Sequence, residues 1–269
     1  MVIDRFFIHY KPPTQYIYWG ENRVDVYKRS DSNKNLKKSN TFENVFLMGI
    51  TSDEFGVIAK ELPSVDTGVV LNSSQFIFNI FEFEKIPFKE GLKRDLVEWR
   101  LKKVFPENID DYAHDYFKLS KDRILSILFK KSLKEKIENL FAESGVPLIY
   151  MGNSTVEIMN HLTGKKELTP DFFIEVDKGL SMAVFLDRGI PYYIRKFRSD
   201  QAAGIAGEIV KTINFVKNSY AKVPRSYSIA ADPADVDMQF IRDELSTQAL
   251  QPLDMKNKDP MFFPREKEM

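Results

Sequence analysis

The sequence predicts an α/β protein, because helical and extended patterns alternate along the chain and the strands gather in two antiparallel meanders. The longer meander covers residues 171–198, where three apolar runs are separated by two Gly-containing turns, Asp177-Lys178-Gly179 and Asp187-Arg188-Gly189. The shorter meander lies near the N-terminus. Later helical segments have one apolar face, so we expect them to cover sheets.

The chain before residue 75 is predicted to be mostly strand. The pattern predicts strands at 6–10, 15–19, 23–28, 44–50 and 67–71, with a helix at 52–62. The first three strands are joined by Lys11-Pro12-Pro13-Thr14 and by Gly20-Glu21-Asn22. Residues 30–40 are polar and basic, which predicts a loop, and Ser52 or Asp53 is expected to cap the helix.

Residues 75–129 form a block with its own pattern. Apolar residues recur at helical spacing at Phe88, Leu92, Leu96, Trp99 and Val104, which predicts a helix over 88–105. Extended runs at 75–83, 112–119 and 124–129 predict three strands beside it.

The rest of the chain alternates helix and strand around the longer meander. The pattern predicts helices at 132–144, 154–162, 202–219 and 235–245, strands at 148–151 and 227–230, and a loose tail at 255–269. Gly145 is expected to end the first of these helices. In the helix at 202–219, Gly204 and Gly207 are expected to allow close packing on a sheet.

Composition excludes several classes of protein. Lys+Arg and Asp+Glu both number 39, so no overall charge draws the chain to nucleic acid, which we do not expect as a partner. Cys is absent, which excludes disulfides, Cys-ligated metal sites and a thiol nucleophile. We expect no membrane-spanning segment and no secretory signal, because no apolar run approaches about 20 residues.

Several stretches, weak alone but in a consistent order, carry a family resemblance. They are VVLNSSQF at 69–76, FEKIPFKEGLKRDLVEWRL at 83–101, residues 106–119 with Asp115-Tyr116, LFAESGVPLIYM at 140–151 and GEIVKTINF at 207–215. Together they resemble the actin-like cytoplasmic platform proteins of bacterial envelope machines, the type IV pilus protein PilM and the cytoplasmic part of the type II secretion protein GspL. The last stretch has Lys211 where that family usually has Arg.

The resemblance implies an actin-like fold of two ribonuclease-H-like halves, with a small inserted strand-helix-strand-strand subdomain. The expected domains are residues 1–74 with 130–165 for the first half, 75–129 for the insert, 166–254 for a shortened second half and 255–269 for the tail. Only Ser199-Asp200-Gln201 separates the longer meander from the next helix. The helical subdomain that PilM carries there is therefore expected to be missing.

The resemblance also directs attention to nucleotide loops. In actin-like ATPases a strand ending in Asp-x-Gly holds phosphate and a metal-bound water, which makes Asp177, Lys178 and Gly179 candidate phosphate-loop residues, although the same residues also suit a plain hairpin turn. We expect a vestige, because Lys11-Pro12-Pro13-Thr14, taken as the first loop, lacks two N–H donors, and Ala230-Ala231-Asp232-Pro233 replaces the glycine pair beside adenosine. ATP with Mg²⁺ is accordingly not expected as a cofactor.

Other candidate sites have simpler explanations. His9, His114 and His161 are far apart, and Glu157 with His161 suits a helix-surface pair better than a metal site. The acidic residues Asp232, Asp235 and Asp237 suit capping as well as a cation site, and Asp110-Asp111 suits a turn. We expect no catalytic residue and no metal ligand.

The sequence thus predicts a non-catalytic cytoplasmic scaffold of a type IV pilus or type II secretion platform, peripheral at the inner membrane. Its expected partners are the short cytoplasmic tail of a bitopic inner-membrane protein and, in addition, a secretion or pilus assembly ATPase. Two alternatives stay open. One is an actin-like ATPase or kinase-type enzyme that uses Asp177. The other is a peripheral membrane-surface module that uses the basic residues Lys89, Lys93, Arg94, Arg100, Lys102 and Lys103.

Overall fold

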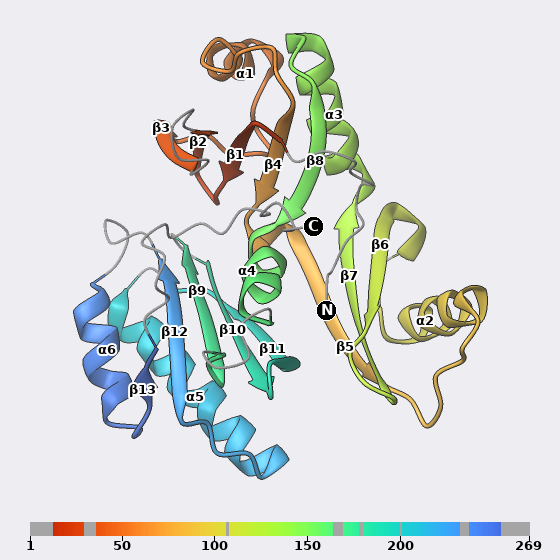
Figure 1. The fold of residues 1–269 in the computed structure, drawn as a ribbon, viewed down its shortest axis with the longest axis vertical. Helices are drawn as coiled ribbons and strands as arrows, with labels where there is room; N and C mark the ends of the chain where they lie inside the picture. The colour runs from red at the N-terminus through yellow and green to blue at the C-terminus, as the bar shows by residue number, and fades with distance from the viewer. Residues whose placement is uncertain are drawn as a thin grey trace. The chain divides into compact units, whose positions relative to one another are not determined.

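A computed structural model describes residues 13–29, 36–105, 108–163, 169–177, 180–199, 201–231 and 237–253. The chain forms two compact units that meet in sequence between Asn153 and Ser154 (Figure 1). We call the part before this point the first unit and the part after it the second unit. The predicted strand at 6–10 and the tail at 255–269 lie outside the described residues.

The first unit is built on a five-stranded sheet. Its strands are β1 (Gln15–Trp19), β2 (Arg23–Arg29), β3 (Leu36–Glu43), β4 (Thr67–Leu71) and β8 (Leu148–Asn153), in the order β3-β2-β1-β4-β8. The first three are antiparallel neighbours, whereas β4 runs parallel to β1 and β8 runs parallel to β4. β1 and β4 are buried at every residue and β2 at its first five, which include the polar Arg23 and Asp25. Both faces of this part of the sheet are therefore covered.

Two helices, α1 (Ser52–Ala59) and α3 (Lys131–Ser144), pack together in this unit. Phe55 of α1 stacks on Trp19 of β1, with ring centroids 6.0 Å apart, and lies 5.0 Å from the ring of Phe141 in α3. These aromatic contacts fix both helices on the sheet. α3 ends at Gly145, whose φ of 69° is the left-handed conformation that favours glycine, as the sequence predicts.

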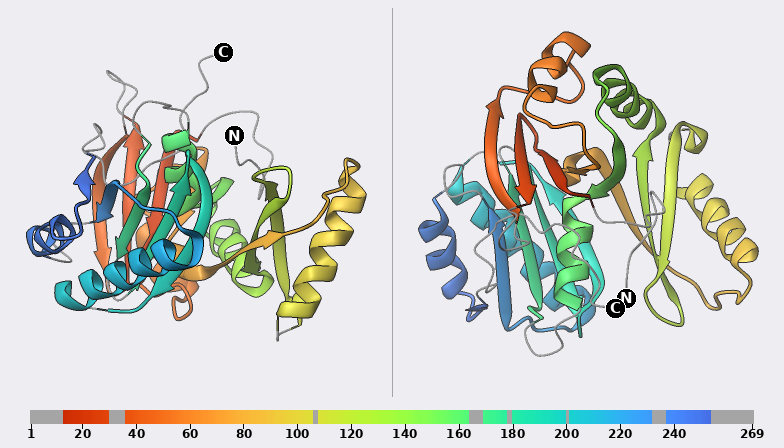
Figure 2. Two further views of the ribbon diagram at one scale, coloured as in Figure 1. Left: turned by 90° about the horizontal axis from the view of Figure 1, so that it is seen from below. Right: turned by 45° about the horizontal axis from the view of Figure 1, so that its top comes forward.

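A smaller three-stranded sheet is inserted between β4 and α3. Its strands are β5 (Phe76–Glu82), β6 (Tyr112–Lys118) and β7 (Arg123–Lys130), in the order β5-β7-β6, and the short helices η1 (Ser73–Gln75) and η2 (Ile109–Asp111) lead into it. All neighbours are antiparallel. Helix α2 (Glu90–Val104) covers one face of this sheet, with Val97 and Leu101 buried against residues such as Ile124 and Leu128 (Figure 2).

The second unit repeats the strand order of the first. Its strands are β9 (Phe172–Asp177), β10 (Leu180–Asp187), β11 (Ile190–Phe197), β12 (Ser226–Ala231) and β13 (Gln251–Pro252), in the order β11-β10-β9-β12-β13. β9, β10 and β11 form the predicted antiparallel meander, and β12 and β13 continue in parallel, so every strand matches its counterpart in the first sheet.

Helices α5 (Ala202–Tyr220) and α6 (Met238–Ser246) cover one face of this second sheet. The predicted apolar face of α5 is confirmed, because Ile205, Ile209, Ile213 and Val216 are all buried in its core. Helix α4 (Ser154–Thr163) begins the unit. Four residues, 198–201, separate β11 from α5, as expected from the short Ser199-Asp200-Gln201 segment.

Three sequence predictions in the first unit are wrong. Residues 36–40 belong to strand β3 rather than to a loop, and residues 44–50 form turns rather than a strand. β3 is an edge strand, so its exposed side has no need of apolar residues, and its lysines discourage pairing with another chain. Thr51, not Ser52 or Asp53, caps α1, since its side chain accepts from the Glu54 N–H and Glu54 returns the bond.

The expected glycine packing on α5 is also wrong, and the core side of α2 is not formed by the large apolar residues whose spacing predicts this helix. On α2, Leu92 and Trp99 are exposed and the core side is formed by Val97 and Leu101, while Phe88, expected in this helix, lies before its first residue and is exposed. On α5, a Cβ at Gly207 would meet nothing within 4 Å, and one at Gly204 would meet the Ser199 side chain rather than a strand. These glycines therefore do not serve close packing on the sheet.

The short strand β13 has no apolar signal and was not predicted. Among the helices of the described residues, none combines the length and the apolar character that crossing a membrane requires.

Candidate functional site

The ends of the central strands β1 and β9 are equivalent positions in the two sheets. Each strand lies between an antiparallel hairpin partner and a parallel neighbour. β9 ends at Asp177, which is buried, and the predicted phosphate-loop residues Lys178 and Gly179 follow outside the described part of the chain. β1 ends at Trp19, which is fully buried.

This equivalence corrects the position of the first loop. The turn between β1 and β2 is Gly20-Glu21-Asn22, closed by a 2.9 Å hydrogen bond from the Gly20 N–H to the Arg23 carbonyl. Lys11-Pro12-Pro13-Thr14, which the sequence suggests for this loop, instead precedes β1, and its first two residues lie outside the described residues. β1 therefore ends in the indole of Trp19, whereas β9 ends in the carboxylate of Asp177.

The second sheet carries a buried carboxylate that sequence reasoning missed. Glu175 lies two residues before Asp177 on β9 and so faces the same side of the sheet. The hydroxyls of Ser154 and Thr155, the first two residues of α4, each donate a hydrogen bond to one oxygen of the Glu175 carboxylate. The only sequence signal was one acidic residue inside the apolar run Phe172–Asp177.

This arrangement places a negative charge at the N-terminus of α4. The positive end of a helix dipole and free N–H groups at that end stabilise an anion, and here the protein's own carboxylate takes that position. The strand neighbours of Glu175 are Ala230 and Met182, which offer no further charge. The Glu175 carboxylate thus uses the two hydroxyl donors at the start of α4.

The adenosine-side segment lies at the same edge. Ala231 of β12 is the register partner of Val176, so β12 ends beside the end of β9. The alanines expected from sequence are thus placed next to the candidate loop, whereas Asp232 and Pro233 lie outside the described residues.

In the first sheet, the corresponding edge carries amide and hydroxyl groups. Asn72 and Asn153 follow or end the parallel strands β4 and β8, and both are buried. The Asn72 amide lies 3.3 Å from the Tyr18 hydroxyl and the Asn153 amide lies 3.3 Å from the Ser73 hydroxyl. These side chains satisfy one another, which suits a fixed structural link between strand ends.

The other candidate residues are separated. The His114 Nε2 lies 3.6 Å from Glu98 Oε1 of α2, and burial lowers the pKa of the His114 imidazole. Asp237 caps α6 by accepting a 3.1 Å hydrogen bond from the Phe240 N–H, and Asp110 and Asp111 lie in η2. His9, Asp232 and Asp235 and the side chain of His161 lie outside the described part, within which no three acidic or His side chains group around a possible metal position.

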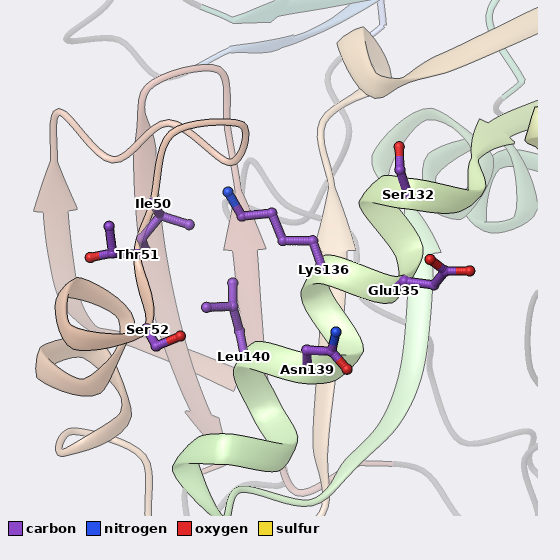
Figure 3. Close-up of a pocket in the computed structure, with 8 residues that line it drawn as sticks. All are labelled: Ile50, Thr51, Ser52, Ser132, Glu135, Lys136, Asn139 and Leu140. Carbon is purple, nitrogen blue, oxygen red and sulfur yellow. The ribbon is translucent and has the colours of Figure 1, made fainter.

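A groove of about 500 Å³ lies between the start of α1 and α3 (Figure 3). Its walls are Ile50, Thr51 and Ser52 on one side and residues of α3, from Ser132 to Leu140, on the other. The Lys136 Nζ reaches across and donates a 2.8 Å hydrogen bond to the Met48 carbonyl. The groove combines apolar side chains with a carboxylate and an ammonium, and α3 follows directly on β7 of the inserted sheet.

The six basic residues predicted as a lipid-binding face do not form one face. Lys93 pairs with Glu90 near the core side of α2, while Lys102 and Lys103 point away from the core. Successive helical residues turn by about 100°, so Arg94 and Arg100 also lie on different sides.

Comparisons with known proteins bear on the fold. No protein-family model matches the sequence, and no curated protein matches it at a significant level. Solved structures do match over nearly the whole chain. A protein of unknown function from Bacteroides thetaiotaomicron, described as having an actin-like ATPase fold, superposes with a TM-score of 0.61 at 14% identity, covering 90% of both chains. The chain has an actin-like fold.

Two further matches come from bacterial envelope machines. A chain of the PilM–PilN type IV pilus biogenesis complex superposes on this actin-like fold with a TM-score of 0.63 at 12% identity, covering 90% of this chain and 88% of that one. The cytoplasmic domain of EpsL, an inner-membrane component of the Vibrio cholerae type II secretion system, gives 0.57 at 9% identity, with 87% and 94% covered. The fold predicted from the family resemblance is therefore confirmed.

Proposed function

We propose that this protein is a non-catalytic scaffold of a type IV pilus or type II secretion platform, working in the cytoplasm at the inner membrane. The observation that carries the proposal is the coverage of the two structural matches. The actin-like chain spans 88% of the PilM–PilN match and 94% of the EpsL cytoplasmic domain, so it has the same extent as well as the same fold. The family resemblance in the sequence points to the same pair.

The strand ends support the absence of catalysis. In an actin-like ATPase the first hairpin must approach phosphate, but here its strand ends in the buried indole of Trp19. In the second sheet, Glu175 takes the favourable anion position at the N-terminus of α4. We expect that Asp177 is a vestige and that ATP with Mg²⁺ is not bound.

The nucleotide arm of the test is calorimetry with ATP and Mg²⁺. We expect no heat of binding when ATP with Mg²⁺ is titrated into the protein at micromolar concentration. Micromolar binding that Asp177→Ala removes would replace the scaffold with an actin-like ATPase or kinase-type enzyme.

The partner we propose is the short, partly apolar N-terminal tail of a bitopic membrane protein, bound in the groove between α1 and α3. Ile50 and Leu140 offer an apolar floor, while Lys136 and Glu135 offer one charge of each sign to main-chain and terminal groups. A micromolar dissociation constant, which corresponds to about 8 kcal/mol, is typical of a short peptide. A secretion or pilus assembly ATPase is a second expected partner.

The partner arm uses tail peptides of the membrane proteins encoded beside this chain. Asn139→Trp places a bulky ring in the groove and should weaken binding about tenfold or more. Glu143→Trp is the matched control, because Glu143 is exposed on the same helix but does not line the groove. Equal affinities of the two folded variants would exclude the groove, and failure of every tail would reject the proposed partner.

A further inference from the structure

The outer side of α2 and the segment just before the helix carry large apolar side chains that are exposed. Phe88 is 94% exposed, Leu92 is 53% exposed and Trp99 is 49% exposed. Leu92 and Trp99 are seven residues apart on α2, which is two helical turns, whereas Phe88 lies two residues before Glu90, the first residue of the helix. We call these three exposed side chains the α2 ridge; Leu92 and Trp99 share one side of the helix.

The helical part of the ridge, Leu92 and Trp99, lies opposite the core side of α2. Val97 and Leu101, which pack on the inserted sheet, are fully buried. Because Trp99 lies two residues after Val97 and two before Leu101, it points about 160° to 200° away from them. The apolar ridge therefore makes no contribution to the core of the inserted sheet.

Lysines accompany both aromatic rings of the ridge. The Lys103 Nζ lies 4.0 Å from the centroid of the Trp99 ring, and the Lys118 Nζ of β6 lies 6.0 Å from the centroid of the Phe88 ring. Lys102 is exposed beside them, and Asp95 adds one negative charge on this side. The outer face thus combines large apolar groups with a net positive charge.

We propose that the α2 ridge binds the surface of an anionic lipid bilayer. Trp and Phe at the level of the lipid headgroups, with Lys beside them, are typical of helices that lie in a membrane interface. The ammonium groups can reach lipid phosphates while their alkyl stems stay with the rings. The ridge is the convex side of a helix, which suits a deformable planar surface, whereas a peptide anchor requires a concave site.

The proposal does not depend on the tail-binding groove, which contains no residue of α2. It assigns to the protein a membrane contact of its own.

The test uses the full chain and vesicles of phosphatidylcholine, with or without phosphatidylglycerol. Co-sedimentation with the anionic vesicles and not with the neutral ones is the expected result, weakened by high salt because exposed charges are screened. The chain has only two Trp residues, so Trp19→Phe leaves Trp99 as the single reporter on the ridge. A blue shift of its emission on anionic vesicles is expected.

Two pairs of substitutions locate the contact. Lys102→Glu with Lys103→Glu should weaken vesicle binding about tenfold or more, since each basic residue near an anionic surface contributes to binding. Lys37→Glu with Lys60→Glu is the matched control, because both lysines are exposed, lie outside α2 and change the net charge equally. Phe88→Ser, at a side chain that is almost fully exposed, should weaken binding without loss of thermal stability.

No binding to anionic vesicles, or equal losses in the two double variants, would overturn the proposal. So would binding without a shift of Trp99 emission. If ridge variants instead abolish capture of a protein partner while vesicles are never bound, the ridge is a protein interface and the lipid proposal is rejected.

Discussion

The Thr155 hydroxyl at the start of α4 donates a hydrogen bond to the Glu175 carboxylate in the middle of β9. Both residues are buried, and Ser154 supplies a hydroxyl to the other carboxylate oxygen. The contact ties the first turn of a helix to the central strand of the second sheet. Substitutions at Thr155 and Glu175 can therefore test whether Glu175 is a structural residue.

Thr155→Val should lower the free energy of unfolding by about 1–3 kcal/mol, because it removes a donor from a buried carboxylate without changing the side-chain shape. Glu175→Gln should be destabilising too. The loss of unfolding free energy in the double variant should be smaller than the sum of the two single-variant losses by about 0.5 kcal/mol or more, since the side chains are in contact. Urea unfolding measures all three, and strictly additive losses would show that the two residues are independent.

Gly145→Ala should destabilise the first unit by about 1–2 kcal/mol, because a φ of 69° places a Cβ too close to the backbone. Gly56→Ala is the matched control within α1, where an added Cβ would meet nothing within 4 Å. This second change should stabilise by about 0.5–1 kcal/mol, the helix preference for Ala over Gly. Thermal unfolding separates them, and two shifts of the same sign would contradict the backbone argument.

Tyr116 should make the protein less stable at alkaline pH. Burial, together with a 2.6 Å hydrogen bond from its hydroxyl to Glu90 Oε1, raises the pKa of Tyr116 to about 12 from 10.0. Between these two values the unfolded chain has lost the proton that the folded chain keeps, so the free energy of unfolding falls as pH rises. Below pH 10 the contribution is fully present.

The comparison is with Tyr116→Phe, because other groups also titrate in this range. The variant should lose less stability than the wild type between pH 10 and about 12. Parallel pH profiles of the two proteins would show that the Tyr116 pKa is not raised.

The two tryptophans should differ in quenching by acrylamide. Trp19 is fully buried and stacked on Phe55, whereas Trp99 is half-exposed. Trp99→Phe should therefore leave blue-shifted, weakly quenched emission, and Trp19→Phe should leave red-shifted, strongly quenched emission. Similar quenching constants for the two variants would contradict the assigned orientation of α2.

Most strands and helices could be predicted because their residues alternate or recur with the period of the element. The meander β9-β10-β11 and the apolar face of α5 are clear examples, since both are buried on a continuous surface. β3 was missed because an edge strand of polar residues has the composition of a loop. On α2 the prediction followed the larger apolar residues, but burial followed Val97 and Leu101, which fit between the strands.

The candidate site was harder to predict than the fold. Asp177 was found because Asp-x-Gly is a local pattern, whereas the Glu175 site needs hydroxyls from α4, about 20 residues earlier in the chain. No local sequence pattern predicts that the start of α4 lies against Glu175. The position of the first loop failed for a related reason: only the pairing of β1 with β2 shows that Gly20-Glu21-Asn22 is the hairpin turn.

The parallel pairing of β4 with β8 has a consequence for folding. Val69 and Met151 are register partners 82 positions apart, and the whole inserted sheet lies between them. The hairpins β1–β2 and β6–β7 close over a few residues, so they should form long before β8 reaches β4. Until β8 arrives, the apolar edge of Thr67–Leu71 is open to other chains, as an unpaired strand edge usually is. A nascent or truncated chain that stops before Leu148 should therefore aggregate through β4, whereas one that extends past Asn153 closes its own edge.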